Sequence, residues 1–303
     1  MNHLSIVLII CLLRIFNCAG QSYSKNWENI NYAGDTLISH RMDIYLPKIS
    51  KTKYPAIVLV YGSAFFGNDM KDKAYETLGA PLLDNGFAVV TVNHRSSRDA
   101  IFPAQIQDIK AAVRFIKANG NKYQIDTTFV GITGYSSGGH LSAMMGTSGS
   151  IKLKTINSKT AQIEGDLGNF TSYSSSVNAV VDWFGPTDFQ SMDSCGSTMV
   201  HNAIDSPESI LIGGPIQDNA DLCALANPIS YIDRDDPPFL IIHGDADPLV
   251  PHCQSEMLFK GLQESGVPSQ FVLVPEGGHG PGIFEEEYFE LMINFFLKEL
   301  KRE

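Results

Sequence analysis

Short apolar runs alternate with helix-like segments along most of the chain. The runs are rich in β-branched residues, as expected for strands buried on both faces of a sheet. They lie at Ala56–Tyr61, Phe87–Asn93, Thr128–Thr133, Val177–Phe184, Phe239–His243 and Gln270–Val274. Arg41–Leu46 instead alternates and stops at Pro47, which predicts an antiparallel strand.

Amphipathic helices are expected between these strands. The clearest has Pro103 at its first position and ends at Gly120, with Ile106, Ile109 and Val113 on one face. The others are expected after the turn at residue 136, at 252–264 and at 284–300. This alternation predicts an α/β domain with a mostly parallel central sheet covered by helices on both faces.

Two long segments, 150–176 and 188–232, break the alternation and are rich in Ser, Gly, Asn and Pro. Long irregular segments in compact domains often cover functional sites. We therefore interpret both as insertions over the active face of a single domain, 21–303, rather than as separate domains.

Residues 1–20 differ from the rest of the chain. The stretch from Leu4 to Phe16 is mostly apolar but too short for a membrane span, and small residues follow it. This predicts a signal peptide cut near Gly20, and hence a secreted or periplasmic protein. We favour cleavage over a lipid anchor on Cys18, because Asn17 is larger than the residue such sites prefer. No other stretch is apolar for the about 20 residues that a membrane span needs.

Composition narrows the possible partners and cofactors. The formal net charge is −11, which argues against nucleic-acid binding, since that requires clustered Lys and Arg. The chain has no H-E-x-x-H, C-x-x-C, P-loop or G-x-G-x-x-G pattern, so we expect no metal and no cofactor.

Three cysteines follow the leader: Cys195, Cys223 and Cys253. An exported protein can form disulfides. Cys195 and Cys223 lie in one irregular segment and could pair. The alternative is that all three are unpaired small apolar residues.

The strongest chemical signal is Gly134-Tyr135-Ser136-Ser137-Gly138, between the run Thr128–Thr133 and an expected helix. A G-x-S-x-G sequence in this context predicts a nucleophile elbow, a strained turn that lifts the serine hydroxyl clear of the sheet. We therefore predict that Ser136 is a nucleophile.

A serine nucleophile needs a base and an acid that orients the base, and in this fold they follow in the order Ser, Asp, His. Asp247 follows the strand Phe239–His243, and His279 follows Gln270–Val274. Both therefore lie at carboxyl ends of strands, where open α/β sheets place their sites. We predict Asp247 as the acid and His279 as the base.

Other residues are weaker candidates for these roles. Asp245 is the alternative acid, in which case Asp247 would cap the next helix. His243 ends a strand, His252 starts an expected helix and His140 lies within one, so each is a weaker candidate for the base.

An oxyanion needs backbone N–H donors, and the residue after the nucleophile, Ser137, supplies one. The other is expected in the loop 62–67, which follows the first apolar run. Ser63 is the preferred donor, with Gly62 or Ala64 as alternatives.

Three aromatic residues are candidates for the substrate pocket: Phe65, Trp183 and Phe184. For Trp183 and Phe184 an ordinary core role is the alternative.

These motifs resemble the lipase and esterase branch of the α/β-hydrolases that has an HGGG-type loop, and most closely the bacterial feruloyl and acetylxylan esterases. The resembling stretches are the elbow and residues 42–47, 102–105, 108–112, 185–188, 243–247 and 278–280. The chain departs from the family pattern at Tyr61-Gly62-Ser63, where His-Gly-Gly is usual, and at Asn93-His94-Arg95, where a Tyr-Arg pair is common. The resemblance implies the α/β-hydrolase fold and the same triad.

The predicted function is that of a serine carboxylic-ester hydrolase acting on short-chain or aromatic acyl esters. The resemblance implies acetyl or feruloyl groups on plant polysaccharides, so the expected partner is a small-molecule or polysaccharide-linked ester. One alternative is a serine peptidase of the prolyl-oligopeptidase type, although the sequence has no spare length for the propeller domain usual in that group. The other is a non-catalytic binding protein on the same scaffold.

Overall fold

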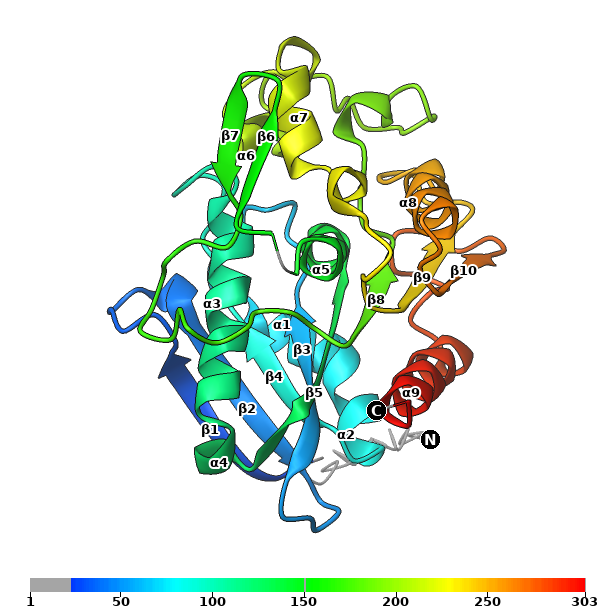
Figure 1. Cartoon of the computed structure of the whole chain (residues 1–303). Helices are drawn as coiled ribbons and strands as arrows, with labels where there is room; N and C mark the ends of the chain where they lie inside the picture. The colour runs from blue at the N-terminus through cyan, green and yellow to red at the C-terminus, as the bar shows by residue number, and fades with distance from the viewer. Residues whose placement is uncertain (1–22, 150, 303) are drawn as a thin grey trace, which may run out of the picture.

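An eight-stranded sheet forms the centre of the molecule, in the order β1-β2-β4-β3-β5-β8-β9-β10 (Figure 1). The computed structural model describes residues 23–149 and 151–302. The predicted signal peptide, with the alternative anchor at Cys18, lies outside the described residues. The strands are β1 (Tyr23–Asn31), β2 (Arg41–Pro47), β3 (Tyr54–Val60), β4 (Ala88–Val92), β5 (Ile125–Tyr135), β8 (Ala179–Trp183), β9 (Phe239–Gly244) and β10 (Ser269–Val274).

The direction of the strands agrees with the sequence pattern. The alternating segment forms β2, which is antiparallel to both β1 and β4. The continuous apolar runs form β3, β4, β5, β8, β9 and β10, which pair in parallel. Their carboxyl ends therefore meet at one edge of the sheet, and the predicted α/β sheet is confirmed.

Strand β3 shows why these runs are continuous. Ala56, Val58 and Val60 belong to one buried cluster, and Ile57 and Leu59 belong to another on the opposite face. Successive side chains of a strand point to opposite faces, so a strand covered on both sides needs apolar residues at every position.

Helices supply the two covers (Figure 1). Helices α3 (Ala104–Ala118), α5 (Ser137–Thr147) and α8 (Cys253–Glu264) contribute to the first cluster. Helices α1 (Lys71–Ala74), α2 (Ala80–Asp84) and α9 (Glu286–Leu300), with the turn Tyr75–Gly79, contribute to the second. The face predicted for α3 is correct, since Ile106, Ile109 and Val113 are fully buried. No helix in the described part of the chain is long and apolar enough to cross a membrane.

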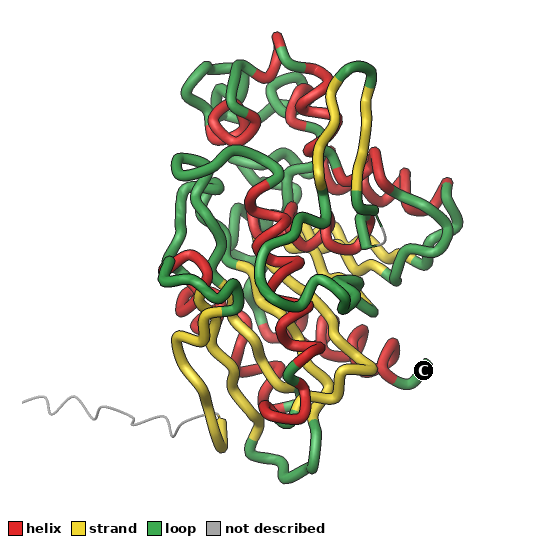
Figure 2. The backbone as a smooth tube through the Cα atoms, turned by 60° about the vertical axis from the view of Figure 1, so that its left-hand side comes forward, coloured by secondary structure: helices red, strands yellow, loops and turns green. Residues whose placement is uncertain are grey.

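The two predicted insertions have some regular structure. The first contains a hairpin of β6 (Leu153–Ile156) and β7 (Lys159–Gln162), which packs against α7 (Ala220–Ala226), apart from the central sheet (Figures 1 and 2). The second contains α7 and α6 (Pro207–Ile212), joined by turns.

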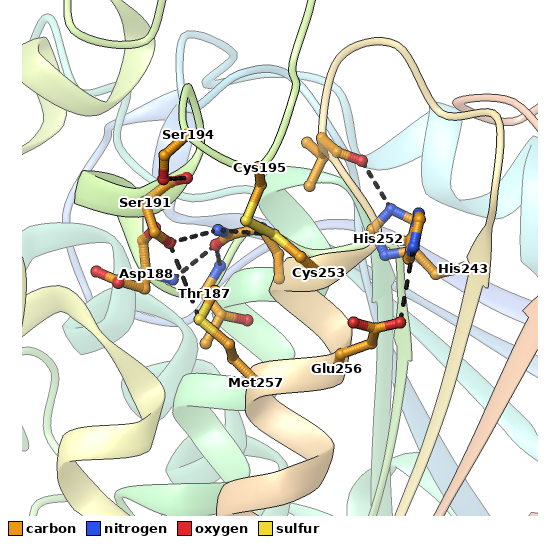
Figure 3. The surroundings of a disulfide bond; sticks show 12 residues. Thr187, Asp188, Ser191, Ser194, Cys195, His243, His252, Cys253, Glu256 and Met257 are labelled. Carbon is orange, nitrogen blue, oxygen red and sulfur yellow. Dashed lines mark hydrogen bonds and ion pairs between the residues drawn. A yellow bond between two sulfur atoms is a disulfide. The ribbon is translucent and has the colours of Figure 1, made fainter.

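A disulfide joins Cys195 in the second insertion to Cys253 at the start of α8 (Figure 3). Neither possibility left open by the sequence, a pairing of Cys195 with Cys223 or three unpaired thiols, is what the structure shows. Cys223 is buried on α7 and unpaired, and burial raises the pKa of its thiol to about 12. Nearness in sequence was misleading, because α7 carries Cys223 into the core whereas Cys195 lies against α8.

The disulfide closes a span of 58 residues, so reducing it should destabilise the fold. We expect reduction, or the Cys195→Ser/Cys253→Ser double variant, to lower the free energy of unfolding by about 2–4 kcal/mol. Thermal or urea unfolding measures the change. The double variant provides the control, since its melting temperature should not respond to reductant. A wild-type melting temperature that is equally unresponsive would contradict the prediction.

Candidate active site

The predicted nucleophile lies on a tight turn between β5 and α5. Ser136 has φ 56°, a conformation that non-glycine residues adopt at a cost, and its N–H donates to the carbonyl of Trp183 at 2.9 Å. A Cβ at Gly134 would lie 2.4 Å from the carbonyl oxygen of Gly138, and one at Gly138 would lie 2.2 Å from that of Val60. Both flanking glycines are therefore required by the close approach of the backbone, as a nucleophile elbow demands.

The structure brings His279 to this serine. The imidazole Nε2 lies 2.9 Å from Ser136 Oγ, and Nδ1 lies 2.7 Å from Asp247 Oδ2. An ionised carboxylate can only accept, so the ring proton is on Nδ1 and Nε2 is free to accept from the serine hydroxyl. This is the protonation pattern that a general base needs.

Asp247 follows β9, and its carboxylate is buried. Its Oδ1 accepts backbone N–H groups from Leu249 and Val250, at 2.9 and 3.0 Å. Burial by itself would raise the pKa of Asp247, but hydrogen bonds from His243 and His279 hold that pKa well below its ordinary value. The carboxylate therefore stays charged and can stabilise a protonated His279.

The alternative acid, Asp245, does not contact His279. Its Oδ1 accepts the backbone N–H of Glu276 at 2.6 Å and so supports the loop that carries His279. The sequence-based choice of Asp247 over Asp245 therefore agrees with the geometry.

The other candidate histidines have partners other than Ser136. His243 is fully buried, with Nδ1 2.7 Å from Ser255 Oγ. Its Nε2 lies 2.8 Å from the carbonyl oxygen of Val250 and 3.5 Å from Asp247 Oδ2, so it supports the acid. His140 lies buried on α5 with Nδ1 2.8 Å from the carbonyl of Pro186, and burial lowers its pKa to about 4. His252 lies 3.6 Å from Glu256 on α8 (Figure 3).

The loop after β3 passes directly over the elbow. A Cβ at Gly62 would lie 2.7 Å from the carbonyl oxygen of Tyr135, and Ala64 and Phe65 have φ values of 50° and 63°. The N–H of Ser63, the preferred donor, donates to Ser137 Oγ at 2.9 Å.

Within the described chain, no group accepts from the backbone N–H of Ala64 or Ser137. Both residues line the same pocket as Ser136, so their N–H groups are available to an oxyanion. The Ser63 N–H is instead engaged by Ser137 Oγ.

A pocket of about 340 Å³ opens beside Ser136. Phe65 and Phe184 line it, as predicted. Trp183 has the core role that was its alternative, because its indole is fully buried and Nε1–H donates to Thr133 Oγ1 at 3.1 Å. Both Trp183, the last residue of β8, and Phe184 belong to the second core cluster, but only Phe184, with φ 46°, also lines the pocket.

The second insertion, interpreted above as lying over the active face, supplies part of the pocket wall through residues that the sequence did not single out. The residues concerned are Met199, His201, Pro207 and Glu208. None of residues 151–176 lines this pocket, so only one of the two insertions reaches the site. The insertion lacks the apolar periodicity that would have oriented its side chains from sequence alone.

A buried carboxyl lies beneath the elbow. Asp182 on β8 is fully buried, and its Oδ1 accepts the N–H of Gly185 at 2.9 Å. Its Oδ2 has no partner among the described residues. Burial raises the pKa of Asp182 from its usual 3.8 to about 7.

This shift makes stability depend on pH. The folded state binds the proton of Asp182 more tightly than the unfolded state, so wild-type stability falls as pH rises from about 4 to about 7. The side chain of Asp182→Asn does not titrate. We therefore expect the free energy of unfolding of the variant to increase relative to that of wild type as pH rises from about 4 to about 7, and the difference to stay constant at higher pH. Urea unfolding at pH 5 and pH 8 measures the difference, and a difference independent of pH would contradict the expectation.

Together, the sheet order, the elbow and the hydrogen-bonded Ser136, His279 and Asp247 define an α/β-hydrolase. Residues 42–262 match the BD-FAE family model, and the chain belongs to this family.

Solved structures and curated proteins agree with this assignment. A structure described as a truncated form of a carbohydrate esterase from gut microbiota is 51% identical, with a TM-score of 0.89, over 92% of this chain and 97% of that one. A bifunctional GH43-CE protein of Bacteroides eggerthii is 52% identical, with a TM-score of 0.87, over 90% of this chain and 35% of that one. Esterase LipQ of Mycobacterium tuberculosis is 28% identical over 74% of this chain, which spans 50% of LipQ. The chain thus spans about half the length of these curated relatives.

Proposed function

We propose that the protein is a carboxylic-ester hydrolase that works through an acyl-serine intermediate. The observation that carries the proposal is the continuous hydrogen-bonded series from Ser136 Oγ through His279 to Asp247, at the wall of a pocket. Membership of a family whose relatives are named esterases supports the same activity.

The reaction proceeds in two halves. Ser136 Oγ attacks the ester carbonyl while its proton moves to His279 Nε2, and Asp247 stabilises the imidazolium. The N–H groups of Ala64 and Ser137 donate to the oxyanion. The tetrahedral intermediate collapses, and the alcohol leaves with the proton from His279. Water, deprotonated by the same histidine, then releases the acid and restores the serine.

The pocket indicates the size and character of the substrate. Its volume of about 340 Å³ and its mostly apolar wall suit a short or aromatic acyl group. The solved relatives include one described as a carbohydrate esterase. We therefore propose acetyl or feruloyl esters of plant polysaccharides as substrates, and an exported protein that meets them outside the cytoplasm.

A panel of esters tests the function. It comprises 4-nitrophenyl acetate, 4-nitrophenyl butyrate, methyl ferulate and acetylated xylan, with an aminoacyl 4-nitroanilide to detect peptidase activity. We expect hydrolysis of esters and none of the anilide. Cleavage of the anilide without that of any ester would replace the proposal with a peptidase.

A further inference from the structure

One carboxylate interrupts the largely apolar wall of the pocket. Glu208 is the second residue of α6, only 4% exposed, and lines the same pocket as Ser136. Helix α6 is held in place at its start, because Ser206 Oγ accepts the N–H of Ser209 at 3.1 Å. The carboxylate therefore has a fixed position that the proposed mechanism does not use.

The partner of Glu208 is His201, which is also buried. Its Nε2 lies 3.0 Å from both the carbonyl oxygen of Leu249 and Ser197 Oγ, and its Nδ1 lies 2.9 Å from Glu208 Oε2. The Ser197 hydroxyl donates its proton to the Leu249 carbonyl at 2.8 Å, so it accepts from Nε2. With acceptors at both ring nitrogens, both carry protons and the pair is an imidazolium with a carboxylate. Burial would lower the pKa of His201, but its hydrogen bond to Glu208 raises it overall, which agrees with this pairing.

The pairing satisfies only one of the two carboxylate oxygens. No donor in the described chain reaches Glu208 Oε1, whereas Oε2 is held by His201. Oε1 is not one of the buried polar atoms that lack a partner, so it is accessible from the pocket, and a bound group that displaces water from it has to replace the lost hydrogen bond. Oε1 is thus an acceptor in a wall otherwise made largely of aromatic and aliphatic side chains.

Charge decides which donor fits this oxygen. The positive charge of His201 already balances Glu208, and no lysine or arginine lines the pocket. A substrate cation would leave an uncompensated positive charge in the pocket. An anionic group has no proton to donate to Oε1 and would be repelled by the carboxylate. A neutral hydroxyl group satisfies Oε1 without either cost.

We propose that Glu208 Oε1 accepts a hydrogen bond from a hydroxyl group of the bound ester, and that Glu208 is therefore a specificity-determining residue. The inference rests on the proposed esterase function. The hydroxyl belongs either to the acyl group, as in a phenolic acid, or to the alcohol, as in a sugar.

The prediction is a preference for hydroxyl over methyl ether at one position of the substrate. An ether oxygen can only accept and leaves Oε1 without a donor, so the ether should be a poorer substrate by roughly 10- to 100-fold in kcat/KM. In Glu208→Gln the amide oxygen takes over the bond from His201, and the amide N–H₂ faces the pocket. Because that group can donate to an ether, the preference should largely disappear.

Two pairs of esters separate the two sources of the hydroxyl. The acyl arm compares methyl 4-hydroxycinnamate with methyl 4-methoxycinnamate. The alcohol arm compares an acetylated methyl β-xyloside with its O-methylated counterpart. We expect wild type to show the hydroxyl preference in one arm and Glu208→Gln to lose it in the same arm.

Glu256→Gln is the matched control. Glu256 also pairs with a histidine, His252, but on the exposed side of α8 and outside the pocket (Figure 3). This variant should keep the wild-type preference. If Glu208→Gln fails to fold, Glu208→Asp replaces it, since the shorter side chain draws the oxygen back and should reduce the same preference.

Equal rates for hydroxyl and ether esters in both arms of wild type would overturn the inference while leaving the esterase function intact. So would a preference that survives in Glu208→Gln. Failure of wild type to hydrolyse any ester would instead refute the proposed function itself.

Discussion

Ser136→Ala and His279→Ala should each hydrolyse 4-nitrophenyl acetate about 10⁴-fold more slowly than wild type, or slower still. Without the serine hydroxyl no acyl-enzyme forms, and without the imidazole no group 2.9 Å from Ser136 Oγ accepts its proton. The double variant should be about as slow as either single variant, because the two residues act as one unit. Steady-state kinetics measures these rates, after subtraction of the spontaneous hydrolysis in a blank that contains no enzyme.

Matched controls come from the surface. Ser194→Ala and His252→Ala remove a serine and a histidine that lie near the disulfide, outside the pocket (Figure 3). Both should keep rates close to wild type. Activity in Ser136→Ala comparable to that of Ser194→Ala would contradict the assignment of the nucleophile.

Asp247→Asn should also lower kcat by about 10⁴-fold, although it changes one atom. Leu249 and Val250 donate to Oδ1, so the amide oxygen takes that position and the N–H₂ group faces His279 Nδ1. Nδ1 must then accept, which puts the ring proton on Nε2. In this tautomer His279 cannot take the proton of Ser136.

Asp245→Asn is the control for this substitution. Asp245 Oδ1 accepts the N–H of Glu276, and an amide oxygen can keep that bond. We expect a far smaller effect on kcat than for Asp247→Asn. The reverse order of effects would make Asp245 the orienting acid and overturn the proposed triad.

Much of this site could be predicted because its signals are local. The elbow needs glycines at fixed positions, because a Cβ at Gly138 or Gly134 would lie only 2.2 or 2.4 Å from a backbone oxygen. Asp247 and His279 each follow a recognisable strand, and parallel strands bring their carboxyl ends to one edge. Periodicity and chain order were therefore sufficient to bring these residues together.

The unpredicted features depend on contacts between distant segments. Strand β1 has a mixed burial pattern without a continuous apolar run, and the hairpin β6–β7 packs mainly on α7. The position of α8 determines the disulfide partner of Cys195. The way the second insertion packs over the site determines which of its residues line the pocket. No local pattern encodes these contacts, and none distinguishes a pocket role from a core role for Trp183.

Covalent capture of the nucleophile tests the central claim most directly. A 4-nitrophenyl alkylphosphonate forms a stable tetrahedral adduct with a serine that is activated by a neighbouring base, and it mimics the charge of the acyl-transfer intermediate. Peptide mass spectrometry should locate one adduct, on Ser136, together with loss of esterase activity, and the adduct should be absent from Ser136→Ala and greatly slowed in His279→Ala. Loss of activity with the adduct on another residue, or full activity with Ser136 modified, would contradict the account.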